Sequence, residues 1–267
     1  MLRSPLERIC LVALGLLTAV VFAILYMPVF IAALFSVVPV DRTGTHWDQA
    51  TFEWYARLLD NPSVIDALRM SALVGVIAVA AATVIAIAIA LYVQSEHAMF
   101  RGAIEVAIYL PFLMPPIVTG LSLLIYFNNL GIQRGVVTIA IGHTALVLAI
   151  LYRLILTRLR SIPNSMLEAS SDLGATRWQT FRHVIWPQLR SAAVTGGLLA
   201  LAISFDETFI TVFLGGDTTT LPLRLWGMMR VGFTPEINAL VTIMLAASIA
   251  LTVVASLRLV PRDTPRT

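Results

Sequence analysis

Six long apolar runs, separated by polar segments, make up most of the chain. Four runs carry no charge and exceed the roughly 20 residues that a membrane-spanning helix needs: Ile9–Val40, Met70–Gln94, Val106–Gln133 and Ile237–Leu257. Gly135–Tyr152 is shorter, and Ser191–Gly216 is interrupted by Asp206 and Glu207. The pattern predicts six spanning helices, at about residues 9–38, 69–94, 104–129, 135–156, 191–214 and 237–259.

The composition supports an all-α membrane protein with a single transmembrane domain over residues 1–267. The chain is 58% hydrophobic and 12% charged, and its mean hydropathy is +0.88, which is outside the range of soluble domains. Arg3 and Arg8 precede the first run as they would in a signal peptide, but the run is too long for a cleavable segment. We therefore expect a retained first helix.

Two segments carry further local predictions. Phe52–Leu59, in the long segment after the first run, is amphipathic and aromatic, which predicts a short helix at the membrane surface ending near Asn61 and Pro62. The third run contains Pro111, Pro115, Pro116 and Gly120. These residues predict a kinked helix that neighbouring helices bury, because the freed carbonyl groups need partners in lipid.

The arginines predict the orientation, because short cytoplasmic loops are rich in positive charge. With the N-terminus inside, the inner side holds twelve of the 18 basic residues: Arg3, Arg8, Arg101, Arg153, Arg158, Arg160, Arg177, Arg182, Arg190, Arg258, Arg262 and Arg266. The outer side holds six: Arg42, Arg57, Arg69, Arg134, Arg224 and Arg230. Both termini and the loop at residues 157–190 are therefore expected in the cytoplasm.

The loop at 157–190 has the pattern helix, sharp turn, helix, proline. Ser165 to Glu168 has the S-x-x-E form of a capping box, and Gly174 suits the left-handed end of a short helix. Thr176 to Gln179 is a second capping box, and Pro187 is expected to bend the chain back towards the fifth span. Such a hairpin suits either docking on a partner protein or simple placement at the membrane interface.

The same segment resembles the EAA loop in permease subunits of binding-protein-dependent ABC importers. The matching residues are Glu168, Ala169, Gly174, Ile185 and Pro187, whereas Ser170 replaces an alanine and Trp186 a leucine. The position between spans four and five matches as well. The resemblance implies an ATPase-coupling site made of Glu168, Ala169, Ser170, Asp172, Gly174, Ala175, Ile185 and Pro187.

What the resemblance implies is a permease subunit in a bacterial inner membrane whose coupling helices dock on a separate ABC ATPase. ATP and magnesium would bind that ATPase and no cofactor would bind this chain, which has no G-x-x-x-x-G-K-[ST] phosphate loop. The expected partners are ATPase subunits, a second and related permease, an extracytoplasmic solute-binding protein and the lipid bilayer. No nucleic-acid partner is expected.

The substrate prediction is polyamine. The segments around Leu221–Met228 and Ile237–Leu240, together with Ser204–Glu207, are similar to spermidine/putrescine importer permeases. Asp206 and Glu207 lie at membrane depth, where carboxylates are costly unless they are paired or face water. They are candidates for the substrate pathway: one could line the path and attract a cationic solute, while the other pairs with an arginine or caps a helix break. The alternative is that both merely hold an interrupted helix together.

Other functions are less well supported by the sequence. Another small organic ion or an amino-acid derivative remains an alternative substrate, and an ion-driven secondary transporter or a membrane scaffold an alternative class. No set of residues resembles a catalytic centre or a metal site, so enzyme activity is not expected. His143, inside the fourth span, is predicted to be a hydrogen-bonded packing residue rather than a ligand or proton relay.

Overall fold

The computed structural model describes the whole chain except residues 1–4, 42–43, 96–97, 232–233 and 260–267. The described elements are α1 (Pro5–Phe35), β1 (Val40–Asp41), β2 (Gly44–Thr45), the 3₁₀ helix η1 (Trp47–Gln49), α2 (Glu53–Leu59), α3 (Pro62–Gln94), α4 (Arg101–Leu113), α5 (Pro116–Asn129), α6 (Val136–Arg160), α7 (Asn164–Asp172), α8 (Arg177–Thr180), the π-helix η2 (Phe181–Ile185), α9 (Trp186–Asp206), α10 (Phe209–Leu214), α11 (Leu221–Val231) and α12 (Pro235–Leu259). The predicted all-α class is confirmed, with one two-residue antiparallel pair as the exception.

The chain forms two compact units. One comprises Met1–Asn61 with Met228–Ala246, and the other comprises Pro62–Gly227 with Ala247–Thr267. The single domain predicted from the sequence stays a prediction.

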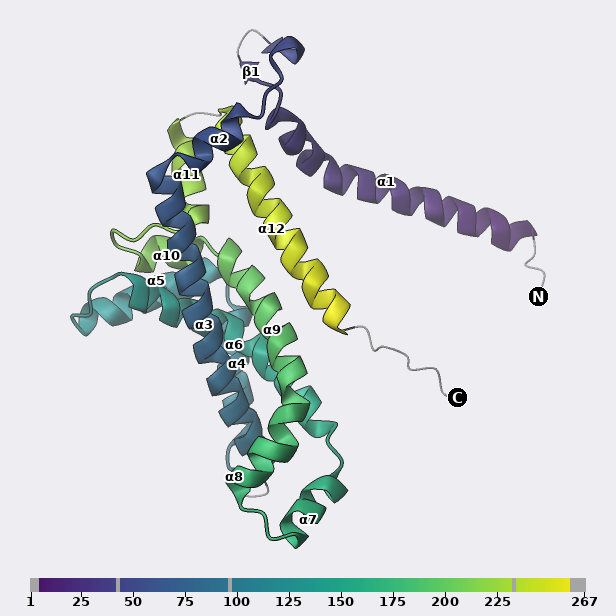
Figure 1. Ribbon diagram of the computed structural model, residues 1–267, viewed down its shortest axis with the longest axis vertical. Helices are drawn as coiled ribbons and strands as arrows, with labels where there is room; N and C mark the ends of the chain where they lie inside the picture. The colour runs from purple at the N-terminus through teal and green to yellow at the C-terminus, as the bar shows by residue number, and fades with distance from the viewer. Residues whose placement is uncertain (1–4, 42–43, 96–97, 232–233, 260–267) are drawn as a thin grey trace. The chain divides into compact units, whose positions relative to one another are not determined.

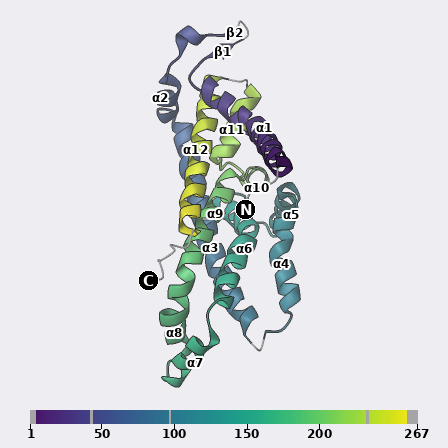
Figure 2. The same cartoon turned by 90° about the vertical axis from the view of Figure 1, so that its right-hand side faces the viewer.

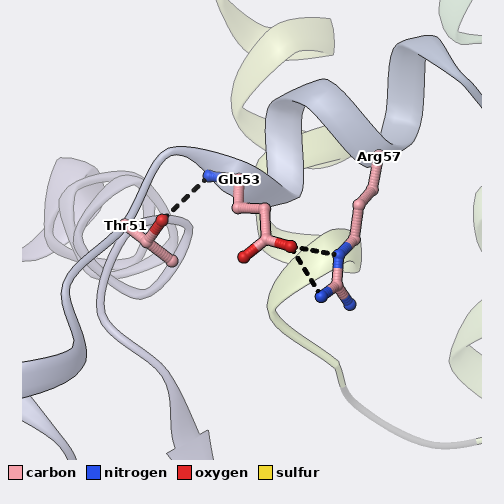
Figure 3. A network of polar contacts seen from close by, with 3 residues as sticks. All are labelled: Thr51, Glu53 and Arg57. Carbon is pink, nitrogen blue, oxygen red and sulfur yellow. Dashed lines mark hydrogen bonds and ion pairs between the residues drawn. The ribbon is translucent and has the colours of Figure 1, made fainter.

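In the first unit, α1 is an apolar helix whose described side chains are mostly exposed to the surroundings. After α1, the Ser36 and Tyr55 hydroxyl groups lie 2.7 Å apart. The predicted surface helix is α2: the Thr51 hydroxyl accepts a hydrogen bond from the Glu53 amide, and Arg57 pairs with Glu53 one turn later (Figure 3). Phe52 at the capping position makes no side-chain cap, so the ion pair and the Thr51 hydroxyl, which satisfies the first amide of the helix, favour a short helix here.

The second unit is built on α3, α6 and α9, which pack against one another and run side by side (Figures 1 and 2). The face of α3 in this packing is lined by alanines at intervals of four residues, which are fully buried: Ala78, Ala82, Ala86 and Ala90. Small residues at this spacing let helix backbones approach closely in a membrane, where packing drives helix association. Larger side chains of α6 fill the space between the helices, among them Leu151, Tyr152 and Ile155.

Five described helices are long and apolar enough to cross a membrane, and a sixth span results when a bent pair is counted as one. The five are Cys10–Phe35, Pro62–Gln94, Val136–Arg160, Arg177–Asp206 and Pro235–Val254; the bent pair is α4 with α5. The helices extend beyond several of the predicted spans. α3 begins before the predicted residue 69, and α6 continues past the predicted residue 156.

The third predicted span is broken rather than kinked. Its halves α4 and α5 meet at a bend of 109°, where Met114 and Pro115 are both extended. Burial among neighbouring helices was also expected, and this expectation is wrong within this chain. Most side chains of α4 and α5 are exposed, because α6 and α10 cover them from one side only.

Candidate functional site

The glycine corner of the connecting loop has the geometry that the sequence predicts. Gly174 follows the end of α7 with φ of 76°, in the left-handed region. Its amide donates to the Ser171 carbonyl at 2.9 Å, and the Ala175 amide donates to the Ser170 carbonyl at 3.1 Å. These two bonds form a Schellman motif, which satisfies the last carbonyl groups of a helix. Gly174 therefore fixes the direction in which the chain leaves α7.

One of the two predicted capping boxes is present. The Thr176 hydroxyl accepts from the Gln179 amide, and the Gln179 side chain accepts from the Thr176 amide at 2.7 Å. The box predicted from Ser165 to Glu168 is wrong. Helix α7 begins at Asn164, directly after the extended Pro163, and no side chain caps it. Ser165 therefore lies within the first turn, past the capping position.

The second short helix is not separate from the fifth span. α8, η2 and α9 form one continuous helical run, Arg177–Asp206, so the predicted bend at Pro187 is wrong. Instead, the run contains a π-helical segment immediately before Pro187, and the Trp186 amide donates to the Phe181 carbonyl five residues earlier. A π turn adds a residue to the helix and is a known way to accommodate a local disturbance such as a proline.

The predicted coupling residues occupy one end of the second unit (Figure 1). On α7 and at the corner, Glu168, Ala169, Asp172 and Gly174 are exposed, as is the intervening Leu173 at 88%. Further along, Pro187 is also exposed. The half-buried residues of the set are Ser170, Ala175 and Ile185, and Ile185 packs against the apolar core.

A hydroxyl contact joins the two short helices. The Ser170 and Thr180 hydroxyl oxygens are 2.9 Å apart. The family pattern has an alanine where Ser170 stands. An alanine has no hydroxyl group, so a chain that follows the pattern could not make this contact. The hairpin thus presents a rigid corner with exposed apolar and acidic side chains.

The second candidate site is a helix break at residues 206–208. α9 ends at Asp206, Glu207 has an extended backbone with ψ of 117°, and α10 begins at Phe209. Thr208 stands at the capping position of α10 and makes no side-chain cap. The Glu207 carboxylate, one residue earlier, accepts a hydrogen bond from the Ile210 amide at 3.0 Å and so caps the first turn of α10. Asp206 is exposed and has no salt bridge among the described residues. The predicted cap at the helix break is therefore supplied by Glu207, and the predicted place of the other carboxylate in the substrate pathway stays a prediction.

His143 lies beside this break. Its side chain is 1% exposed, and its two ring nitrogens contact hydroxyl groups on either side of the break: Nδ1 is 2.8 Å from Ser204 Oγ of α9, and Nε2 is 3.1 Å from Thr211 Oγ1 of α10. The sequence-based interpretation of His143 as a hydrogen-bonded packing residue is confirmed. Its two partners were not predicted.

One acidic residue of the apolar region was overlooked. Glu105 of α4 accepts a hydrogen bond at 3.1 Å from the hydroxyl group of Tyr152 on α6, a residue that is itself fully buried. Glu105 directly precedes the uncharged window of the third run. A carboxylate at the start of a predicted span is the sequence feature that could have identified it. A carboxylate at membrane depth is a candidate by default, although this one already has a partner.

The two sets of residues remain apart. Pro187 and Asp206 are the two ends of α9, so about 28 Å of helix separates them at 1.5 Å per residue. An influence of the corner on the break can pass along α9, or through α3 and α6, because Leu167 and Ile185 pack against the apolar core that these helices share. Among the described residues, no group of three or more His, Cys, Asp or Glu side chains is placed to hold a metal ion.

Comparison with known proteins identifies the class of protein. Residues 82–260 match the family described as "Binding-protein-dependent transport system inner membrane component". The chain is 36% identical over 243 residues to the spermidine/putrescine transport system permease protein PotC of Haemophilus influenzae, covering 89% of this chain and 93% of the relative. It is 34% identical over 254 residues to the putrescine transport system permease protein PotI of Escherichia coli, covering 92% and 87%.

Solved structures show the same fold. A bacterial ABC transporter involved in the import of the acidic polysaccharide alginate aligns with a TM-score of 0.66 at 15% identity, covering 97% of both chains. An amino acid ABC transporter aligns with a TM-score of 0.59 at 17% identity, covering 76% of this chain and 96% of the other. The chain therefore belongs to the family of binding-protein-dependent transport system inner membrane components, as a multi-pass permease subunit of an ABC importer.

Proposed function

We propose that this permease subunit imports polyamines and is driven by a separate ATPase that docks on the corner at Gly174. The observation that supports this choice of substrate is the 36% identity, over 89% of the chain, with a permease named for spermidine and putrescine. The physical chemistry of the helix break is consistent with it. Polyamines are cationic, and an exposed carboxylate at a helix break attracts cations.

A competing substrate class is anionic. The chain is 25% identical over 234 residues to the sulfate transport system permease protein CysT of Escherichia coli. Two adjacent carboxylates at the break, Asp206 and Glu207, would repel an anion, and the described part of the break has no arginine in a salt bridge with either. The cationic substrate is therefore favoured over an anionic one, while other small organic cations remain alternatives.

The docking proposal is based on the shape of the loop. The corner is rigid because the Schellman motif and the Thr176 capping box fix both helix ends, and Leu173 at its tip is 88% exposed. An apolar side chain held outwards on a rigid corner suits insertion into a groove of another protein. In this proposal ATP and magnesium act on the ATPase, both termini and the corner are cytoplasmic, and a second permease and an extracytoplasmic binding protein complete the importer.

Uptake of labelled spermidine, by cells expressing the whole complex, tests the substrate. We expect Asp206→Asn to raise the KM for uptake about tenfold, which corresponds to about 1.4 kcal/mol of lost attraction. Asp217→Asn is the matched control, because Asp217 is an exposed carboxylate outside the break. An unchanged KM in both Asp206→Asn and Glu207→Gln would exclude the carboxylate proposal, and a wild-type complex that carries a different solute instead would exclude polyamines.

Co-purification of the ATPase with the permease tests the docking site. Glu168→Arg reverses an exposed charge, and we expect it to reduce the recovered ATPase at least fivefold while the permease still inserts. Gly174→Val should do the same, because a β-branched residue is strained at φ of 76° although a Cβ atom there meets nothing within 4 Å.

Gly174→Asn is the matched control for that substitution. Asparagine tolerates the left-handed conformation, so this variant should keep the corner and the ATPase. Equal recovery of ATPase from Gly174→Val, Glu168→Arg and the wild type would show that the ATPase docks elsewhere.

A further inference from the structure

The helix break at residues 206–208 is held by groups outside it. The extended backbone at Glu207 ends the hydrogen-bond ladder of α9, so α10 starts afresh with the Glu207 carboxylate as its cap. A cap fixes the start of α10 but leaves open the angle between α10 and α9. In lipid, a break of this kind is stable only where neighbouring helices satisfy and support it.

Helix α6 fixes α10 along its length. At Gly142, an added Cβ atom would lie 2.5 Å from Ile210 Cγ2 and 2.8 Å from Leu214 Cδ1, so α10 already touches the α6 backbone there. At the far end of α10, the Leu214 carbonyl accepts hydrogen bonds from the Thr138 hydroxyl at 2.8 Å and from the Gly135 amide at 3.0 Å. α10 is therefore fixed to α6 at both of these points.

The last turn of α9 is fixed from the other side. Ser204 is 3% exposed and lies beside Gly75 of α3, where an added Cβ atom would come within 2.8 Å of Leu201 Cδ1 and 3.7 Å of Ser204 Oγ. The Ser204 hydroxyl therefore has little freedom to move. Its contact with His143 joins the end of α9 to α6.

His143 connects these two fixed halves. A neutral imidazole has one donor and one acceptor nitrogen, and serine and threonine hydroxyl groups can act as either. The bridge from Ser204 to Thr211 can therefore form in both tautomers of His143. Because both ring nitrogens are engaged, the ring is oriented fully and has no nitrogen left for a solute.

We propose that His143 is a positioning residue for transport. Its two hydrogen bonds, here called the clasp, hold α9 and α10 together across the break and so set the direction of the Asp206 and Glu207 carboxylates. The Ser204 contact lies two residues before Asp206, and the Thr211 contact lies four residues after Glu207. Loss of the clasp would let the two ends of the break turn independently. The role in transport rests on the proposed function, whereas the clasp itself does not.

A distance measurement tests the clasp without any substrate. Spin labels are attached to Val194→Cys on α9 and Phe209→Cys on α10, both exposed positions, in the assembled complex with the lone Cys10 replaced by alanine. We expect His143→Leu to at least double the width of the distance distribution. His143→Gln, whose amide can still donate and accept, should keep the wild-type width. Thr195→Val, which removes a buried hydroxyl of α9 away from the break, is the control.

Uptake kinetics on the same variants test the positioning role. We expect His143→Leu to raise the KM for spermidine about tenfold with the maximal rate within twofold, and His143→Gln to restore the KM. If His143→Leu fails to assemble, Ser204→Ala and Thr211→Val each remove one half of the clasp and should widen the distribution singly. An unchanged distance distribution in His143→Leu, or in both hydroxyl variants, would overturn the proposal.

The two readouts also separate this proposal from the substrate assignment. A wild-type complex that does not carry spermidine, combined with a broadened distribution in His143→Leu, would reject polyamines and keep the clasp. A broadened distribution with an unchanged KM in a complex that does carry spermidine would reject the positioning role.

Discussion

The second unit contains two broken helices, and they are broken for different reasons. Between α4 and α5, Met114 and Pro115 each precede a proline, and a residue before a proline is restricted to extended conformations. The break between α9 and α10 has neither proline nor glycine at residues 206–208. The first break follows from local covalent chemistry, whereas the second depends on contacts with α3, α5 and α6.

This difference predicts different responses to substitution. A break imposed by prolines persists wherever its surroundings move, because the restriction lies in the backbone itself. A break imposed by packing and hydrogen bonds changes when a distant contact is altered. We therefore regard the α9–α10 break as the adjustable one, which suits a position beside the candidate substrate pathway.

The largest expected effect follows from Gly142→Ala. The added Cβ atom would lie 2.5 Å from Ile210 Cγ2, so α10 must move away from α6. Overpacking of this kind costs about 1–3 kcal/mol, and we expect the thermal midpoint of the purified complex to fall by several degrees. Gly102→Ala is the matched control, because a Cβ atom there meets nothing within 4 Å. Equal midpoints for the two variants would show that α10 is free to shift.

An intermediate effect is expected from Glu207→Ala. This variant removes the acceptor for the Ile210 amide, and loss of a helix cap costs about 0.5–2 kcal/mol. Glu207→Gln keeps a carbonyl oxygen at the same place, so it should retain most of that stability while losing the charge. Thermal midpoints measure the cap and uptake measures the charge. Equal destabilisation by both variants would argue against the capping role.

The smallest effect on stability is expected from replacing Pro115 and Pro116 together by alanine. Loss of a proline at a compatible position changes stability by about 0.4–1 kcal/mol. The geometry, however, should change: without the restriction on Met114, we expect the 109° bend to open. Spin labels at the exposed Val106 and Ile125 would report this as a longer mean distance. An unchanged distance would show that tertiary contacts, and not the prolines, maintain this break too.

Local chemistry explains which features the sequence predicts well. Gly174 and the Thr176 capping box depend on residues within five positions of each other, and both are present as expected. The capping box predicted at Ser165 does not form because the helix begins earlier, with Pro163 at the capping position. Ser165 matches the sequence pattern but lies inside the first turn. The bend at Pro187 failed because a π turn absorbs the proline within a continuous helix.

Long-range contacts explain what the sequence could not predict. The partners of His143 lie 61 and 68 residues away, and Tyr152 lies 47 residues from Glu105. No periodicity specifies which of many apolar helix faces meet in a bundle. The sequence thus identified Asp206 and Glu207 as an interruption, because charge in an apolar run is a local signal, but not the clasp that supports it.

The π-helical segment η2 (Phe181–Ile185) also accommodates one extra residue between the glycine corner and the fifth span. Each residue of a regular α-helix advances the direction of its side chains by about 100°. A π turn takes in one more residue per turn, so the side chains that follow it keep nearly the direction that a regular helix one residue shorter would give them. Deleting one residue within η2 should therefore leave α9 in phase with α8, whereas deleting one residue from the regular part of α9 would turn every later side chain, Asp206 included, by about 100°.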